Sequence, residues 1–273
     1  MVLAVKPPTA GKSRLRGALP GVPHEALALA LALDTATAAL ASPEVAEVIA
    51  VTGDPGAAAA LAALGARPVD EPVGGGLNPA FAWGAAAALD RPVAALQADL
   101  PALDPADLTA ALRASETLRR YAADPTARRY AADTPSTGTV LLTAPPGVRL
   151  DPRFGPGSAA AHAASGAVPL DGHWPTLRRD VDTAADLAAA AALGLGPHTA
   201  RLVGYGAGMQ GTVATYDPGS RSGTLLLDDG SELAYPAAAF DASGLRLLRL
   251  GQRVRIEQDP SGVVTRLTIP TMP

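Results

Sequence analysis

The residues best suited to chemistry lie near the start of the chain, where a short apolar stretch ends in a loop with three cations. The chain has two lysines, Lys6 and Lys12, and both lie in this loop together with Arg14. These three cations are spaced so that they could surround a polyanion, and not as they would be on one face of a helix. All other fixed cations are arginines, so an ammonium group used twice in one loop indicates phosphate contact. The alternative is a solvated surface loop.

The same loop partly matches a nucleotide-binding P-loop. Gly11, Lys12 and Ser13 fit the end of that pattern, but the pattern needs a glycine five residues before Gly11, where this chain has Lys6. Pro7 and Pro8 also remove two of the backbone N–H groups that would wrap a phosphate. We therefore do not expect a P-loop.

Three aspartates in or after extended segments are candidates for metal binding. Asp99 follows an apolar stretch, and a carboxylate there can hold Mg²⁺, which prefers oxygen ligands and bridges to substrate phosphates. The alternative for Asp99 is a helix cap. Asp180 and Asp182 are two residues apart, which places them on the same side of an extended segment. Asp182 is also well placed to cap the helix expected from Ala184, in which case Asp180 alone would be the ligand.

Glycine-rich loops supply further candidate binding positions. Residues 153–158 precede an alanine-rich helix with Ser158 as its expected cap, and free N–H groups at such a helix start suit a phosphate or carboxylate. Thr139 begins another strand and offers a hydroxyl group. His162 lies on the alanine-rich helix without a partner at ligand spacing, so we interpret it as structural and assign no catalytic histidine.

The elements that position these residues alternate between strand and helix up to about residue 200. Strands are expected at residues 2–5, 45–51, 67–69 and 92–98, and helices at 24–41, 55–64, 79–89 and 105–114. This alternation predicts an α/β fold with a mixed, mostly parallel sheet and helices on both faces. The Lys6 loop, residues 52–54 and Asp99 follow three strands, so we expect three strand ends to converge on one site.

Two later segments have patterns of their own. Residues 119–124 and 128–133 repeat the same six residue types, and we expect one copy to form a strand and the other a surface extension. Five alternating segments follow a glycine-rich stretch, at 210–216, 223–227, 232–235, 253–257 and 263–269. We predict a first domain at 1–200, a linker at 201–208 and a small OB-like β-barrel at 209–273.

Composition narrows the class of protein. The chain has 273 residues, a net charge of −4 and no cysteine. The charge gives no general attraction to nucleic acid or to an anionic membrane, and the missing cysteines exclude disulfides and thiolate metal sites. No signal sequence opens the chain, and the apolar residues 27–33 are too few to span a bilayer. We expect a soluble, cytoplasmic protein without a membrane partner.

Six ordered motifs carry a resemblance to a known family. They are residues 3–15, 74–78, 97–101, 137–139, 152–158 and 179–183. Together they resemble the guanylyltransferase family of deazaflavin coenzyme (factor 420) biosynthesis, whose members join GMP from GTP to phosphoenolpyruvate or to 2-phospho-L-lactate. The resemblance covers about residues 1–200, and the chain departs from it in the insertion at 121–129.

The resemblance implies a nucleotidyltransferase fold akin to the molybdopterin guanylyltransferases, together with a set of site residues. The implied Mg²⁺ ligands are Asp99, Asp180 and Asp182. The positions that match those binding the phosphorylated three-carbon acceptor are Thr139, Gly155 and Ser158. Catalysis would fall to Lys12, Arg14 and Asp99, and GTP would contact Lys6, Lys12, Arg14, Gly75, Gly76 and Asn78.

The expected function is GTP-dependent guanylyl transfer to phosphoenolpyruvate, with 2-phospho-L-lactate as the alternative acceptor. A different class remains open, because the C-terminal segment weakly resembles a cold-shock domain and would suit an RNA-binding regulator. Ser222 and Thr224 replace the stacking aromatics of that family, leaving only Tyr235. Stacking and a basic groove carry single-strand binding, so we do not expect nucleic acid as a partner. We favour a structural or protein-contact role, with a downstream enzyme of the coenzyme pathway as the partner.

Overall fold

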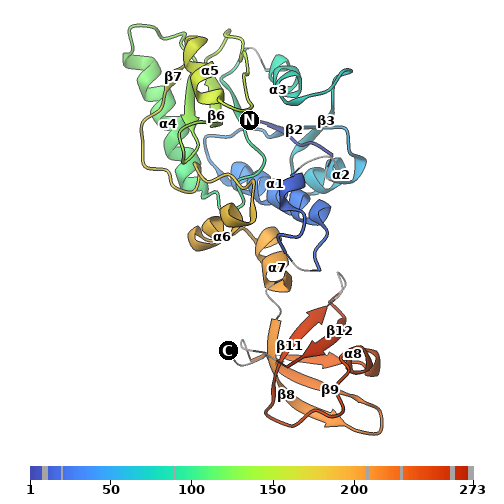
Figure 1. Ribbon diagram of the computed structural model, residues 1–273. Helices are drawn as coiled ribbons and strands as arrows, with labels where there is room; N and C mark the ends of the chain where they lie inside the picture. The colour runs from blue at the N-terminus through green and yellow to red at the C-terminus, as the bar shows by residue number, and fades with distance from the viewer. Residues whose placement is uncertain are drawn as a thin grey trace. The chain divides into compact units, whose positions relative to one another are not determined.

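The computed structural model describes residues 1–7, 12–19, 21–88, 90–206, 209–227, 230–258 and 262–269. Contacts divide the chain into two units (Figure 1). The first comprises Met1–Leu19 and Pro23–Ala200, and Arg201–Pro273 makes up most of the second.

The first unit is built on a mixed sheet with the strand order β3-β2-β1-β4-β6-β5-β7. Pairings β1–β2, β1–β4, β2–β3 and β5–β7 are parallel, whereas β6 runs antiparallel to β4 and β5. The strands are β1 (Val2–Ala4), β2 (Ile49–Thr52), β3 (Arg67–Asp70), β4 (Val93–Leu96), β5 (Arg129–Ala132), β6 (Thr139–Ala144) and β7 (Val168–Pro169). The predicted α/β class with a mostly parallel sheet is confirmed.

Helices cover both faces of this sheet because successive residues of a strand point to opposite sides. Leu3 of β1 packs in one apolar cluster with α1, α2 and α4, and its neighbour Val2 packs in another with α3 and α5. Figure 1 shows α3 across the sheet from α1 and α2. The helices are α1 (His24–Ala41), α2 (Pro55–Ala63), α3 (Leu77–Ala86), α4 (Pro105–Tyr121), α5 (Ser158–Ala164) and α6 (Ala184–Leu193).

Helix α1 has the bounds, 24–41, that its apolar pattern predicts. Among the described residues it is the one helix that could cross a membrane by length and composition, and 56% of it is buried inside the protein. Ala32 and Ala36 of α1 belong to the core cluster on one sheet face. Packing against the sheet therefore accounts for its apolar composition.

The tandem repeat falls differently from our expectation. The second copy supplies strand β5, as expected of one copy. The first copy is a surface extension only in its exposed residues 122–124, because α4 continues through Arg119 and Arg120 to Tyr121. Glu116 forms ion pairs with Arg119 at i+3 and Arg120 at i+4, which support the last turn of the helix.

The second unit is an antiparallel sheet with the order β10-β9-β8-β11-β12. Residues of the edge strands β10 and β12 approach one another, and the enclosed core includes Tyr235 and Phe240. Its elements are β8 (Met209–Asp217), β9 (Ser222–Leu227), β10 (Glu232–Tyr235), α8 (Ala237–Ala242), β11 (Arg253–Gln258) and β12 (Val264–Thr268). A small β unit is thus present, while its identity as a cold-shock-like barrel remains a prediction.

The segment predicted as a linker at 201–208 is helical over most of its length. Helix α7 (Pro197–Gly206) runs through it, and residues 207–208 lie outside the described part of the chain. The carboxylate of Asp34 accepts hydrogen bonds from the backbone N–H groups of His198 and Thr199 at 2.9 and 2.7 Å. Asp34, which is far from α7 in the sequence, thus supplies the acceptors that the start of this helix needs. The glycine content of the segment did not indicate a helix.

Candidate functional site

A cavity of about 420 Å³ lies beyond the carboxyl ends of β1 and β4. Lys6 follows β1 and Asp99 follows β4, and both line it. The other lining residues are Ala4, Val5, Lys12, Arg14, Ala28, Leu31, Ala32, Leu77, Gln97, Ala98, Asp180 and Asp182. The loop cations and the three aspartates therefore surround one space, although the motifs that carry them are far apart in the sequence.

The expectation that three strand ends converge is wrong for the third. Residues 52–54, at the carboxyl end of β2, are not among the described residues that line the cavity. The Asp54 carboxylate instead accepts a hydrogen bond from the N–H of Ala57 at 2.7 Å and caps α2. The first N–H groups of a helix have no partner within the helix, so the Asp54 carboxylate serves as their acceptor.

Lys12 joins two of the three aspartates. Its ammonium group donates to the carboxylates of Asp99 and Asp182. Burial opposes the charged form of Lys12, but the two carboxylates outweigh burial and hold the pKa of Lys12 above its ordinary value. Lys12 also has a left-handed backbone, with φ at 52°.

Asp180 nevertheless feels the charges of several other carboxylates. Burial, followed by the charges of Asp99, Asp133 and Asp182, raises the pKa of Asp180 to about 7. The Oδ1 atom of Asp99 is buried and has no hydrogen-bond partner. An unpartnered carboxylate oxygen beside a crowded acid group is an environment that a further cation would stabilise.

The same residues do not form a ready metal cage. Within the described ranges, no group of three or more histidine, aspartate or glutamate side chains is arranged to hold a metal ion. The alternative considered for Asp182 was that it caps helix α6. The cap of this helix is instead Thr183, which forms a capping box with Asp186. Asp182 is therefore not the cap, and its carboxylate contacts Lys12.

The glycine-rich loop before α3 adopts an unusual backbone. Gly74, Gly75 and Gly76 have φ values of 93°, 55° and 107°, a run that L-residues rarely adopt. Leu77, the next residue, lines the cavity, whereas Gly75 and Gly76 do not. The loop thus approaches the cavity where it joins the first residue of α3.

Asn78 makes two hydrogen bonds to the backbone of Phe154. Its Nδ2 donates to the Phe154 oxygen at 3.0 Å, and its Oδ1 accepts from the Phe154 N–H at 2.7 Å. These bonds tie the loop at 74–78 to the loop at 153–158. The structure therefore gives Asn78 a positioning contact, and direct contact with GTP remains a prediction.

The candidate acceptor residues lie around His162 and outside the lining of the first cavity. Thr139 Oγ1 is 2.9 Å from His162 Nδ1, and His162 Nε2 accepts from the Arg153 N–H at 2.9 Å. Because Nε2 accepts, the ring proton of neutral His162 is on Nδ1 and is donated to Thr139. Burial, and next the charge of Arg128, lowers the pKa of His162 to about 4, so the ring is neutral at pH 7. The contacts of neutral His162 with Thr139 and with the backbone of Arg153 support the interpretation of this histidine as structural.

Ser158 is the first residue of α5, which corrects the expectation that it caps the helix. The cap is Gly157, with a left-handed φ of 71°, and no side chain closes the helix start. Glycine takes the position because this backbone is costly for other residues. Gly155, with φ at 133°, has open space where a side chain would begin, and Ser158 is buried.

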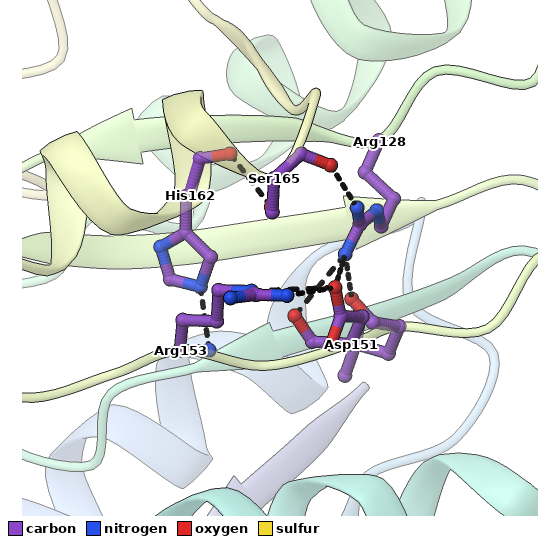
Figure 2. A network of polar contacts seen from close by, with 6 residues as sticks. Arg128, Asp151, Arg153, His162 and Ser165 are labelled. Atoms are coloured by element: carbon purple, nitrogen blue, oxygen red, sulfur yellow. Dashed lines mark hydrogen bonds and ion pairs between the residues drawn. The ribbon is translucent and has the colours of Figure 1, made fainter.

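A polar network holds the segment 151–158, which we call the candidate acceptor loop, to the residue that precedes strand β5 (Figure 2). Arg128 donates to the Asp151 carboxylate at 2.7 Å and to the Ser165 carbonyl at 2.6 Å. Arg153 also contacts the Asp151 carboxylate at 3.2 Å. Sequence reasoning missed Arg128 and Asp151, since they are 23 residues apart and only the fold brings them together.

A mostly parallel sheet with lysines, an arginine and aspartates gathered around one cavity defines an α/β protein with a candidate site for polyanionic ligands. No family model matches the chain. It is 59% identical over 210 residues to the phosphoenolpyruvate guanylyltransferase of Salinispora arenicola, a match covering 76% of this chain and 94% of the relative. Enzymes of the same name from Geodermatophilus obscurus and Thermomonospora curvata are 53% and 51% identical, over 71% and 74% of this chain and 88% and 87% of the relatives. The chain belongs to the phosphoenolpyruvate guanylyltransferase family.

Among solved structures, a CMP:2-keto-3-deoxy-manno-octonic acid synthetase in complex with CTP superposes with a TM-score of 0.45 at 16% identity. The match covers 70% of this chain and 96% of that one.

Proposed function

We propose that this protein transfers GMP from GTP to the phosphate group of phosphoenolpyruvate and releases pyrophosphate. The observation that carries the proposal is the 59% identity to a phosphoenolpyruvate guanylyltransferase across 94% of that relative's length. The clustering of Lys6, Lys12 and Arg14 with carboxylates around one cavity supports it independently.

The cations at the first cavity suit the donor side of this reaction. Lys6, Lys12 and Arg14 line the cavity and would neutralise the triphosphate and the departing pyrophosphate. Gly75 and Gly76, in their left-handed loop, would let the nucleotide approach the backbone, and Asn78 would hold that loop against the acceptor loop.

The acceptor phosphate needs no general base. Its second pKa is about 6, so it is already a dianion near neutral pH. One of its oxygens attacks the α-phosphorus of GTP, a new P–O bond forms, and the bond from the α-phosphorus to the bridging oxygen breaks. Pyrophosphate leaves with that electron pair. Alignment and charge neutralisation are what the protein must supply.

The aspartates offer ligands for a divalent cation, although they do not form a ready cage around one. Asp99, Asp180 and Asp182 supply oxygen ligands, and the unpartnered Asp99 Oδ1 together with the raised pKa of Asp180 favours added positive charge. Bound Mg²⁺ would supply charge stabilisation at the phosphate oxygens. Asp99 would hold Lys12 in place as well, through the contact of the two side chains.

On the acceptor side we assign Thr139, Gly155 and Ser158. Because His162 donates its only ring proton to Thr139 Oγ1, the threonine O–H is free to donate to an anionic oxygen of the acceptor. The open space at Gly155 allows close approach of a ligand to the backbone.

The proposal includes a cytoplasmic location and a downstream enzyme of the coenzyme pathway as partner.

A pyrophosphate-release assay tests the reaction. With GTP and Mg²⁺ we expect release with phosphoenolpyruvate, and none without an acceptor. The matched comparison is 2-phospho-L-lactate, which has a tetrahedral carbon where phosphoenolpyruvate has a planar one. Faster turnover of 2-phospho-L-lactate would reverse the acceptor assignment, and release with neither acceptor would overturn the proposed reaction.

A further inference from the structure

A second cavity, of about 350 Å³, lies at the opposite end of the two strands that lead to the candidate site. Val2, at the start of β1, and Val93, at the start of β4, line it, whereas Lys6 and Asp99, beyond the ends of these strands, line the first cavity. None of the described residues lines both cavities. The second cavity is therefore a separate place in the same unit.

The cavity contains a buried arginine with an unsatisfied donor. Arg129, the first residue of β5, is 2% exposed, and its Nε has no hydrogen-bond partner. Its Nη1 donates to the carbonyl of Ala127 at 2.9 Å. A buried, charged donor without an acceptor is costly, so an anionic oxygen at this point would stabilise the protein.

The carboxylates around the cavity have other partners. Glu44 pairs with Arg113 at 2.8 Å, Glu47 with Arg67 at 2.6 Å and Glu116 with Arg119 at 2.7 Å. No ion pair to Arg129 is recorded among the described residues. Burial, the largest influence, lowers the pKa of Arg129, and the charges of Asp124 and Glu116 do not offset it.

The rest of the lining is mainly apolar. Val45, Leu112 and Val93 contribute hydrocarbon surface. The two hydroxyl groups, of Ser115 and Thr143, hydrogen-bond to each other at 2.8 Å. The guanidinium is thus the polar group in most need of a partner, and the volume is at the lower end of the roughly 300–1,000 Å³ typical of small-molecule sites.

We propose that this second cavity binds a small organic carboxylate, whose anionic group pairs with Arg129 and whose short apolar chain packs on Val45 and Leu112. The tandem repeat also gains a role, because each copy places one arginine, Arg119 or Arg129, in the lining. A carboxylate on a guanidinium forms strong, charge-assisted hydrogen bonds, and the apolar walls favour a hydrocarbon body over a bare anion.

Thermal unfolding of the full chain at constant ionic strength tests the site with three probes: hexanoate, its neutral isostere hexanamide, and inorganic phosphate. At about ten times its Kd we expect hexanoate to raise Tm by about 3 °C, and the other two to have much smaller effects. Arg129→Met should remove the hexanoate shift. The control Arg120→Gln, on the neighbouring helix but outside the lining, should keep it.

Hydrogen exchange on the unmodified protein provides a readout that needs no variant. Hexanoate should slow exchange in β5 and in the last turn of α4, and leave residues 97–99 unchanged. Three results would overturn the proposal: an equal Tm shift with hexanamide or phosphate, a full hexanoate shift in Arg129→Met, or protection confined to the first cavity. Because none of these measurements uses GTP, their failure leaves the proposed guanylyl transfer untouched.

Discussion

Asp180 is surrounded by other carboxylates, and burial together with Asp99, Asp133 and Asp182 raises its pKa to about 7. We predict that Asp180→Asn lowers kcat by about 10²–10³-fold, the loss typical when one group that stabilises transition-state charge is removed. The fold should persist, because the substitution removes a charge from a crowded acidic cluster. Steady-state kinetics and Tm check this, with Asp171→Asn, at an exposed carboxylate, as the control. Near-normal activity would make Asp180 a structural aspartate.

Thr139 offers the corresponding test on the acceptor side. Its hydroxyl accepts from His162 and has its own proton free, so Thr139→Val removes one donor at nearly constant shape. A hydrogen bond to a charged group contributes about 1.5–3 kcal/mol, so the KM for phosphoenolpyruvate should rise about 10–100-fold while that for GTP changes little. The control is Thr143→Val on the same strand, whose hydroxyl contacts Ser115. An effect confined to GTP would move Thr139 to the donor side.

Among the packed elements, β6, α5 and the acceptor loop share one buried histidine. The folded protein keeps His162 neutral down to about pH 4, whereas its ordinary pKa is 6.5. Between these values the unfolded chain binds more protons, so stability is lost as the pH falls from about 6.5 to about 4, by up to about 3 kcal/mol. Urea unfolding across this range should show that loss, and His162→Gln should flatten the profile. The control His173→Gln removes an exposed histidine and should leave the slope unchanged. Equal slopes in all three proteins would contradict the assignment.

The sequence predicts the helices and strands best where local pattern and local caps agree. The bounds of α1 follow from its apolar run, and α4 begins at the predicted residue 105, where Asp104 caps it. The repeated hexapeptide shows the limit of such reasoning, because Arg119–Tyr121 of the first copy finish helix α4, whereas Arg129–Ala132 of the identical second copy form strand β5. Ion pairs to Glu116 support the first copy, and pairing with β6 and β7 supports the second. Identical local propensity therefore leaves the choice to tertiary contacts.

The same limit applies to the candidate site. Strand ends are visible in sequence, so the placement of Lys6 and Asp99 in one cavity could be foreseen. The contacts of Asn78 with Phe154, 76 residues away, and of Thr139 with His162 could not, because no periodicity links such distant positions. Asp54 had the right place in the sequence, but it serves as a helix cap.

For the molecule as a whole, the division into two units predicts that chemistry is confined to the first. All the candidate site residues precede α7, and about a quarter of this chain has no counterpart in a relative that is itself 94% matched. A protein ending after Gly206 keeps α7 and its cap by Asp34. It should retain kcat within about twofold of the full chain, as measured by pyrophosphate release. Loss of turnover with an unchanged circular dichroism spectrum of the first unit would show that the second unit is needed for catalysis.

The second unit should not bind single-stranded RNA appreciably at physiological salt. Such binding depends on aromatic platforms, each contributing about 1–3 kcal/mol per base, and on a basic groove. Ser222 and Thr224 are not aromatic, and Tyr235 is 2% exposed with its hydroxyl bonded to the Thr215 carbonyl, so no base can stack on it. Residues 208–273 hold six arginines and seven acidic residues, which gives no excess of positive charge. Fluorescence anisotropy of a labelled oligonucleotide, compared between the full chain and the protein ending after Gly206, checks this, and the two should give equally weak signals. Sub-micromolar, salt-sensitive binding by the full chain alone would instead support an RNA-binding role for the second unit.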